Sequence, residues 1–149
     1  MEYRRLGNSG LQVSALSFGS WVTFGSQIDY QNSENLMKLA YENGVTFFDN
    51  AEVYASGKSE EVMGKILNKM GWNRSSYVVS SKVFWGGDKP TQVGLSRKHI
   101  FDACNNALKR LQVDYLDLYY IHWREEEFPL ADTMRALNEL VEEGKIRYI

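Results

Sequence analysis

The chain has 149 residues, of which 44% are hydrophobic and 24% are charged, a composition that is ordinary for a soluble globular domain. Its formal net charge of -2 argues against a broad nucleic-acid interface, because such an interface needs clustered lysine and arginine. No apolar run approaches the roughly 20 residues that a membrane-spanning helix requires, and the N-terminal sequence MEYRR lacks the apolar stretch of a secretory signal.

The first third of the chain predicts a hairpin, a short strand and a helix. Residues 3–14 contain two short segments around a turn of glycine, asparagine and serine at residues 7–10, residue types that suit a tight hairpin. Residues 15–19 are a candidate for a short strand and are followed by a loop. A helix is then predicted with Ser33 as its N-cap and Gly44 as its end. The predicted inner stripe of this helix consists of Leu36, Leu39, Ala40 and Tyr41.

The rest of the chain alternates apolar strands with amphipathic helices. Strands are predicted at residues 45–48, 77–83 and 115–121, and a further strand begins at residues 146–149. The first helix between them is predicted to begin at Ser59. The next has Ser96 as its N-cap, and the last has Pro129 in its first turn. With residues 15–19 as the first strand, strand and helix alternate four times and a fifth strand begins. This order is typical of βα units with a parallel sheet, in one domain without a linker.

Three of the predicted strands end in polar residues that a buried strand would not favour: Asp49, Lys82 and His122. In a βα barrel the C-terminal ends of all strands open on one face, where the active site lies. Neighbouring strands are about 4.8 Å apart, so we expect these three side chains to be neighbours. Tyr54, on the loop that follows Asp49, can fold back over the group.

This set of residue types suits proton donation to a carbonyl oxygen. A free tyrosine titrates near pH 10 and is a slow acid at neutral pH, but a neighbouring lysine ammonium stabilises a phenolate and lowers the pKa of a phenol. An aspartate keeps the ammonium charged and in place, and a neutral histidine can orient the carbonyl. General acid assistance of this kind is worth about 10²- to 10⁴-fold in rate. The set therefore suits the reduction of a carbonyl, with hydride from a bound nicotinamide.

Each of these residues also has an ordinary structural interpretation. Asp49 could cap a turn, Tyr54 could be a half-buried ring, Lys82 could reach solvent from its strand end, and His122 could make a structural hydrogen bond. Their joint occurrence at the ends of three consecutive strands disfavours that interpretation. Five aromatic residues just past strand ends either anchor loops or form a wall for a flat substrate or nicotinamide. They are Trp21, Phe24, Phe84, Trp85 and Trp123.

The histidine and cysteine content predicts no metal site and a reducing compartment. The two histidines and the one cysteine show no short spacing of the kind that metal ligands adopt. Cys104 has no partner for an internal disulfide, which favours the cytoplasm.

Five motifs together resemble the aldo-keto reductase family and, within it, the branch that contains the potassium-channel β-subunits. They are YRRLGNSGL (residues 3–11), WVTFG (21–25), FDNAEVY (48–54), KVFWGG (82–87) and GLSRKHI (94–100). The resemblance extends over essentially the whole chain, and the motifs are jointly highly specific.

The resemblance implies the N-terminal half of a (β/α)8 TIM barrel, preceded by a β-hairpin that closes its bottom, with NADPH bound across its mouth. The family's catalytic tetrad corresponds to Asp49, Tyr54, Lys82 and His122. Tyr54 is then the proton donor. The family's cofactor contacts near the nicotinamide correspond to Ser20, Trp21, Gln27, Asp49 and His122. Family members often have threonine at the position of Ser20, and the hydroxyl is retained here.

The leading interpretation is an NADP-dependent carbonyl reductase that acts on small aldehydes or ketones. The alternative is a cytoplasmic module like the channel β-subunits, a branch that is often tetrameric, which would dock on a potassium channel and turn over little. In the animal channel β-subunits an asparagine commonly stands at the position of His122, whereas histidine is the residue of the more active reductases. His122 therefore favours the enzyme.

The length implies an incomplete barrel. Eight βα units need roughly 250 residues, so residues 1–149 are expected to form a partial aldo-keto reductase domain. We expect a fragment, a truncated product or one partner of an assembly with the missing half-barrel or with a second copy of the chain. Alone, the chain is expected to bind NADPH poorly, and a Kd near micromolar would contradict this.

Overall fold

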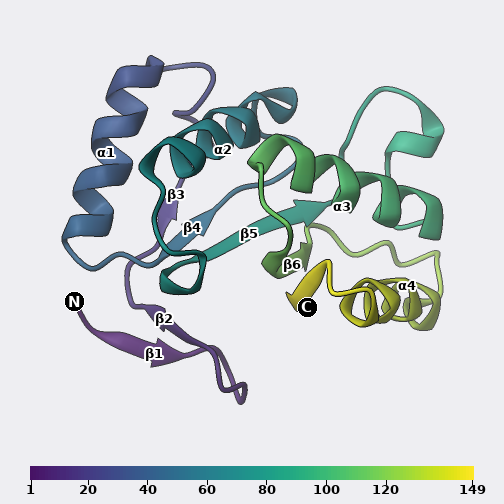
Figure 1. The fold of residues 1–149 in the computed structure, drawn as a ribbon. Coiled ribbons are helices and arrows are strands. Elements are labelled where there is room, and N and C mark those ends of the chain that lie inside the picture. Colours follow the sequence, from purple (N-terminus) through teal and green to yellow (C-terminus); the bar gives the residue numbers. More distant parts are fainter.

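A parallel sheet of five strands forms the centre of the fold in this computed structural model, which describes every residue from Met1 to Ile149 (Figure 1). The strands lie side by side in chain order as β3 (Phe18–Gly19), β4 (Phe47–Asp49), β5 (Val78–Val83), β6 (Leu116–Ile121) and β7 (Ile146–Tyr148). The helices that connect them are α1 (Tyr30–Glu42), α2 (Lys58–Met70), α3 (Arg97–Leu111) and α4 (Leu130–Glu142). The predicted order of four βα units and the start of a fifth strand is thus confirmed.

The predicted hairpin precedes the sheet and lies apart from the four helices in Figure 1. Its strands β1 (Tyr3–Arg5) and β2 (Gln12–Ser14) pair antiparallel, with Tyr3 opposite Ser14. The hydroxyl of Ser14 accepts a hydrogen bond from the backbone N–H of Thr46 at 3.0 Å. This bond ties the hairpin to the chain just before β4, at the N-terminal end of the strands.

Two apolar clusters use opposite faces of the central strands. The larger cluster of 21 buried residues contains Phe48 and Val79, together with the inner faces of the helices. The smaller cluster consists of Val13, Phe47, Val78 and Leu118 and is completed by half-buried hairpin residues. Neighbouring residues of one strand point to opposite faces, so β4 and β5 each contribute to both clusters.

Helix α1 differs from its prediction at its start and on its inner face. Asp29 is the N-cap and accepts a hydrogen bond from the backbone N–H of Asn32 at 2.7 Å. Ser33 lies inside the helix and donates its hydroxyl to the carbonyl oxygen of Asp29. The predicted stripe residues Leu36 and Leu39 are 44% and 58% exposed. The face that packs inward is set by contacts with the core and α2, and its residues are Ser33, Glu34 and Met37.

The remaining helix boundaries lie within a residue or so of the predicted positions. Ser96 caps α3 as predicted, and its hydroxyl accepts the backbone N–H of His99. Pro129 is the N-cap of α4, just before the first turn. Three short 3₁₀ helices lie in the connections, η1 (Tyr54–Gly57), η2 (Arg74–Ser76) and η3 (Pro90–Gln92). None of the helices is both long and apolar enough to cross a membrane.

Candidate active site

The C-terminal ends of three adjacent strands bring together the polar residues that the sequence singled out. Asp49 is the last residue of β4, Lys82 lies one residue before the end of β5, and His122 follows β6 directly. In the ladder between β5 and β6, Lys82 is paired with Tyr120. The parallel arrangement therefore places these side chains on one edge of the sheet although they are far apart in the sequence.

The ammonium group of Lys82 is the centre of the site. Its Nζ donates to Asp49 Oδ2 at 2.7 Å, to the carbonyl oxygen of Asn50 at 2.7 Å and to Tyr54 Oη at 3.0 Å. An ammonium has three N–H donors, so these three contacts use all of them. The side chain of Lys82 is only 13% exposed, and the carboxylate of Asp49 offsets the loss of water around the charge.

The carboxylate of Asp49 accepts a second hydrogen bond, from Ser80, in addition to the one from Lys82. Its Oδ1 accepts a hydrogen bond from the hydroxyl of Ser80 at 2.6 Å, while Oδ2 faces Lys82. Ser80 pairs with Asp49 across β4 and β5. Both oxygens of the carboxylate are thus engaged, which fixes its orientation toward the ammonium.

Tyr54 is positioned by a strained turn. It is the first residue of η1, and its backbone N–H donates to the carbonyl of Ala51. The next residues, Ala55 and Ser56, adopt φ values of +50° and +54°, and Gly57 follows at +88°. Such left-handed conformations in residues other than glycine cost about 1–3 kcal/mol each and persist where the surrounding structure imposes them, often beside functional sites. The turn returns the chain into α2 with the phenol over Lys82.

His122 lies beside Tyr54, with ring centroids 5.9 Å apart and the planes nearly perpendicular. Its backbone N–H donates to the carbonyl of Val83, which anchors it to the end of β5. Burial lowers the pKa of the His122 imidazole from its usual value, and the nearby Lys82 ammonium lowers it further. Both effects favour the neutral form of the ring. Its Nδ1 is buried and has no hydrogen-bond partner within the chain.

Three of the five aromatic residues predicted near the strand ends, the tryptophans, lie around this group, and the two phenylalanines pack against the larger apolar cluster. Trp21 is 69% exposed and stacks on Tyr54 with ring centroids 6.2 Å apart. Trp85 lies between His122 and Trp123, at 5.2 Å and 6.1 Å from their rings. Phe84 packs at 4.7 Å from Trp85. Phe24 is fully buried in the larger apolar cluster, so for this residue the packing interpretation is correct.

The residues assigned to cofactor contact by resemblance differ in their surroundings. Ser20 is fully buried, and its hydroxyl donates to the backbone carbonyl of Asp49 at 3.0 Å. Gln27 is exposed in the loop before α1. Trp21, Asp49 and His122 lie around the phenol and ammonium pair.

Sequence reasoning missed two side chains of the site, Ser80 and Tyr120. Each lies two residues before a predicted site residue on the same strand, Ser80 before Lys82 and Tyr120 before His122. Burial raises the pKa of the Tyr120 phenol, and the Asp49 carboxylate adds to the effect. The two-residue period of a strand was the signal that could have found both.

The structure contains no cluster of three or more histidine, cysteine, aspartate or glutamate side chains that could hold a metal ion. The groups gathered at the strand ends are an acid, an ammonium, a phenol and an imidazole.

Comparison with known proteins identifies close similarities over the whole chain. A family model described as "Aldo/keto reductase family" matches residues 15–149. A probable voltage-gated potassium channel subunit beta from Arabidopsis thaliana is 49% identical over 144 residues, which are 97% of this chain and 44% of that protein. A protein of the same description from Oryza sativa subsp. japonica is 49% identical over 148 residues, 99% of this chain and 45% of that protein.

A solved structure of an aldo-keto reductase has a similar fold. The crystal structure of a thermostable aldo-keto reductase in complex with the inhibitor epalrestat superposes with a TM-score of 0.85 at 37% identity, over 100% of this chain and 53% of that one. The chain thus spans about half the length of the proteins that it matches.

Proposed function

The chain belongs to the aldo/keto reductase family, and we propose that it takes part in the NADPH-dependent reduction of small aldehydes or ketones, with Tyr54 as the proton donor. The observation that carries the proposal is the bridge that Lys82 Nζ makes between Asp49 and Tyr54 Oη. The proposal extends to the whole reductase, of which this chain supplies the proton-donating group.

The direction of the hydrogen bonds explains why Tyr54 is suited to this role. Because Lys82 donates an N–H to the phenol oxygen, the O–H hydrogen of Tyr54 is not used in that contact. It remains available to a carbonyl oxygen placed on the open side of the phenol. The ammonium, 4.7 Å from the ring centroid, also stabilises the negative charge that develops on the phenol as the proton leaves.

His122 is proposed to orient the substrate carbonyl as a neutral imidazole. Its lowered pKa keeps a second positive charge out of a site that already holds the Lys82 ammonium. Removing such a charge from the vicinity of an ammonium avoids like-charge repulsion.

The residues present fit a nicotinamide cofactor, which supplies the hydride when it is bound. The exposed indole of Trp21 offers a flat surface next to Tyr54, and the buried Nδ1 of His122 has no hydrogen-bond partner within the chain. Trp21, Asp49 and His122 are the residues proposed to hold the nicotinamide end, with Gln27 at the adjacent loop and Ser20 acting through its bond to Asp49.

A second candidate function is a channel β-subunit-like regulatory role with little turnover. It is favoured by the two plant relatives at 49% identity, whose descriptions name a voltage-gated potassium channel subunit. We propose this role as the alternative, in the cytoplasm in either case. The presence of His122 in contact with Tyr54 supports the enzymatic role.

The decisive experiment compares NADPH oxidation by the wild type and by Tyr54→Phe, with a generic aldehyde as substrate. Loss of the phenol hydroxyl is expected to lower kcat by about 10²- to 10⁴-fold, the range of general acid catalysis. Tyr115→Phe is the matched control, because Tyr115 lies just before β6, at the opposite end of the strands. Equal activity of Tyr54→Phe and wild type would refute the proposed mechanism. An inactive wild type would point either to the regulatory role or to a chain that needs the remainder of the barrel for turnover.

A further inference from the structure

A buried carboxylate and imidazole lie behind the segment that carries Tyr54. Glu52 Oε1 is 3.0 Å from His99 Nε2, and the two side chains are 4% and 5% exposed. Burying polar groups of this kind is costly unless they are paired and hydrogen-bonded. Neither residue touches the ammonium or the phenol, so the proton chemistry proposed above leaves the pair without a role.

Glu52 attaches the Tyr54 segment to the end of β5 and to the residue that follows it. Its backbone N–H donates to the carbonyl oxygen of Lys82 at 3.4 Å, and its Oε1 accepts the backbone N–H of Phe84 at 2.7 Å. The two contacts lie on either side of Val83. One of them is made to Lys82 itself, and Tyr54 follows Glu52 by two residues. A shift of Glu52 along β5 would therefore change the separation between the phenol and the ammonium.

The same pair also supports the loop that follows β5. A Cβ built on Gly86 would lie 2.6 Å from both Glu52 Oε2 and His99 Cε1, so the loop backbone passes directly against the pair. The loop is closed by the bond from the Gly86 N–H to the Gln92 carbonyl. It carries Trp85, whose ring is 5.2 Å from that of His122. Glu52 and His99 thus contact both the segment that carries Tyr54 and the loop that carries Trp85.

His99 has a fixed position from which to hold Glu52. It lies in the first turn of α3, where its backbone N–H is accepted by the N-cap hydroxyl of Ser96 at 3.1 Å. With the carboxylate of Glu52 as the acceptor, His99 Nε2 carries the hydrogen. The contact therefore connects a rigid helix start to the loop of Tyr54.

We propose that Glu52 and His99 are positioning residues that hold the Tyr54 phenol in register with the Lys82 ammonium. The proposal rests on the proposed function in so far as it concerns turnover, because it assigns no chemistry to the pair itself. A displacement of reacting groups by about 1 Å can cost on the order of 10²-fold in rate. Loss of the His99 imidazole is therefore expected to act on kcat rather than on substrate binding.

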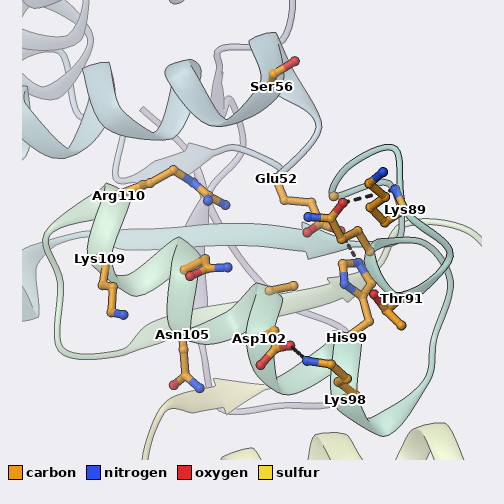
Figure 2. Close-up of a pocket in the computed structure, with 14 residues that line it drawn as sticks. Glu52, Ser56, Lys89, Thr91, Lys98, His99, Asp102, Asn105, Lys109 and Arg110 are labelled. Atoms are coloured by element: carbon orange, nitrogen blue, oxygen red, sulfur yellow. Dashed lines mark hydrogen bonds and ion pairs between the residues drawn. The ribbon is translucent and has the colours of Figure 1, made fainter.

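The pair lines a cavity of about 500 Å³ between η1 and α3, whose other lining residues are almost all polar. Figure 2 shows these lining side chains. Glu52 and His99 are both part of its lining, and their side chains point toward one another. A small molecule can therefore replace a deleted imidazole. This allows a test by chemical rescue, which a general loss of stability would not show.

The test compares His99→Ala, His99→Gln and Lys69→Ala. His99→Ala is expected to lower kcat about 10- to 100-fold with KM changed less than 3-fold, because the phenol loses its register while the binding surfaces remain. Added imidazole is expected to restore most of the loss, and so is His99→Gln, whose amide can donate to Glu52. Lys69→Ala removes the ion pair with Glu34 between α2 and α1 and is expected to leave kcat unchanged. A rise in KM alone, or no rescue by either route, would overturn the proposal.

A second measurement tests the position of Tyr54 without turnover, so it decides the positioning role even if the wild type reduces no aldehyde. In protein with ¹³Cζ-labelled tyrosine, the Tyr54 signal is identified by its absence in Tyr54→Phe. It is expected to move in His99→Ala, to return with imidazole and to stay in place in Lys69→Ala. An unmoved Tyr54 signal in folded His99→Ala would refute the positioning role.

Discussion

At the scale of single residues, one saturated ammonium group determines the geometry of the site. Each of the three N–H donors of the Lys82 ammonium has an acceptor within 3.0 Å of Nζ. The positions of Asp49 and Tyr54 are therefore coupled through Lys82. An arginine at this position would not reproduce the three hydrogen bonds, because a planar guanidinium directs its donors differently from an ammonium. The neighbouring imidazole responds to the same charge, which makes it a reporter of the site.

We predict that His122 titrates below the usual histidine value of about 6.5. Burial lowers its pKa, and the Lys82 ammonium adds to the effect. The unfolded chain then binds more protons than the folded chain between that lowered pKa and about 6.5. The contribution of this group to stability is therefore complete above pH 6.5, falls as the pH drops through this window, and levels off below it.

Proton NMR of the imidazole signals tests this prediction, since the chain contains only two histidines. His122→Asn assigns the signal, and Lys82→Met is expected to raise the midpoint by removing the like charge. A midpoint at or above 6.5 in the wild type would contradict it.

At the scale of elements, local patterns in the sequence predicted the order of strands and helices but not the features that contacts between elements impose. The alternation of strands and helices, and the family to which the chain belongs, are confirmed. Residues at strand ends could be predicted to meet, because parallel strands align their C-terminal ends. The left-handed turn at Ala55 and Ser56 could not, since neither residue favours positive φ. Asp29 and Ser33 are equally good N-cap residues, so the sequence could not choose between them.

The contact between α2 and α3 leads to a prediction about Gly64. This glycine lies in α2, and a Cβ built on it would be 2.2 Å from the carbonyl oxygen of Arg110 and 2.6 Å from the backbone carbon of Leu111. Backbone atoms cannot rotate away, so the helices must separate. Gly64→Ala is expected to lower the free energy of unfolding by about 1–3 kcal/mol, as for overpacked cores, although alanine favours helices more than glycine does by about 1 kcal/mol.

Thermal or urea unfolding followed by circular dichroism measures the change. Asn68→Ala, on the exposed side of the same helix, is the control for helix propensity and is expected to be neutral or slightly stabilising. A Gly64→Ala chain as stable as the wild type would show that α2 and α3 can move apart freely.

At the scale of the whole molecule, the two apolar clusters are expected to unfold together. Phe47 and Phe48 are adjacent on β4, and Val78 and Val79 are adjacent on β5, yet the members of each pair belong to different clusters. A strand cannot leave one cluster without leaving the other, and its hydrogen bonds to the neighbouring strands break in the same step. The hairpin, although it is separate from the five-stranded sheet, should therefore contribute to the stability of the helical side.

Cys104 offers a direct test of this coupling. It is fully buried in the larger cluster on α3, and burial raises the pKa of its thiol to about 12, so a thiol reagent should modify it only when the fold opens. Val13→Ala, in the hairpin and on the far side of the sheet, removes about two methylene equivalents from the smaller cluster, or about 1–2 kcal/mol. The labelling rate of Cys104 is then expected to rise about 5- to 30-fold. Gly10→Ala, where an added Cβ meets nothing within 4 Å, is the hairpin control. If Val13→Ala loosens the hairpin while Cys104 labels at the wild-type rate, the two faces of the sheet open independently and the hairpin is a separate unit.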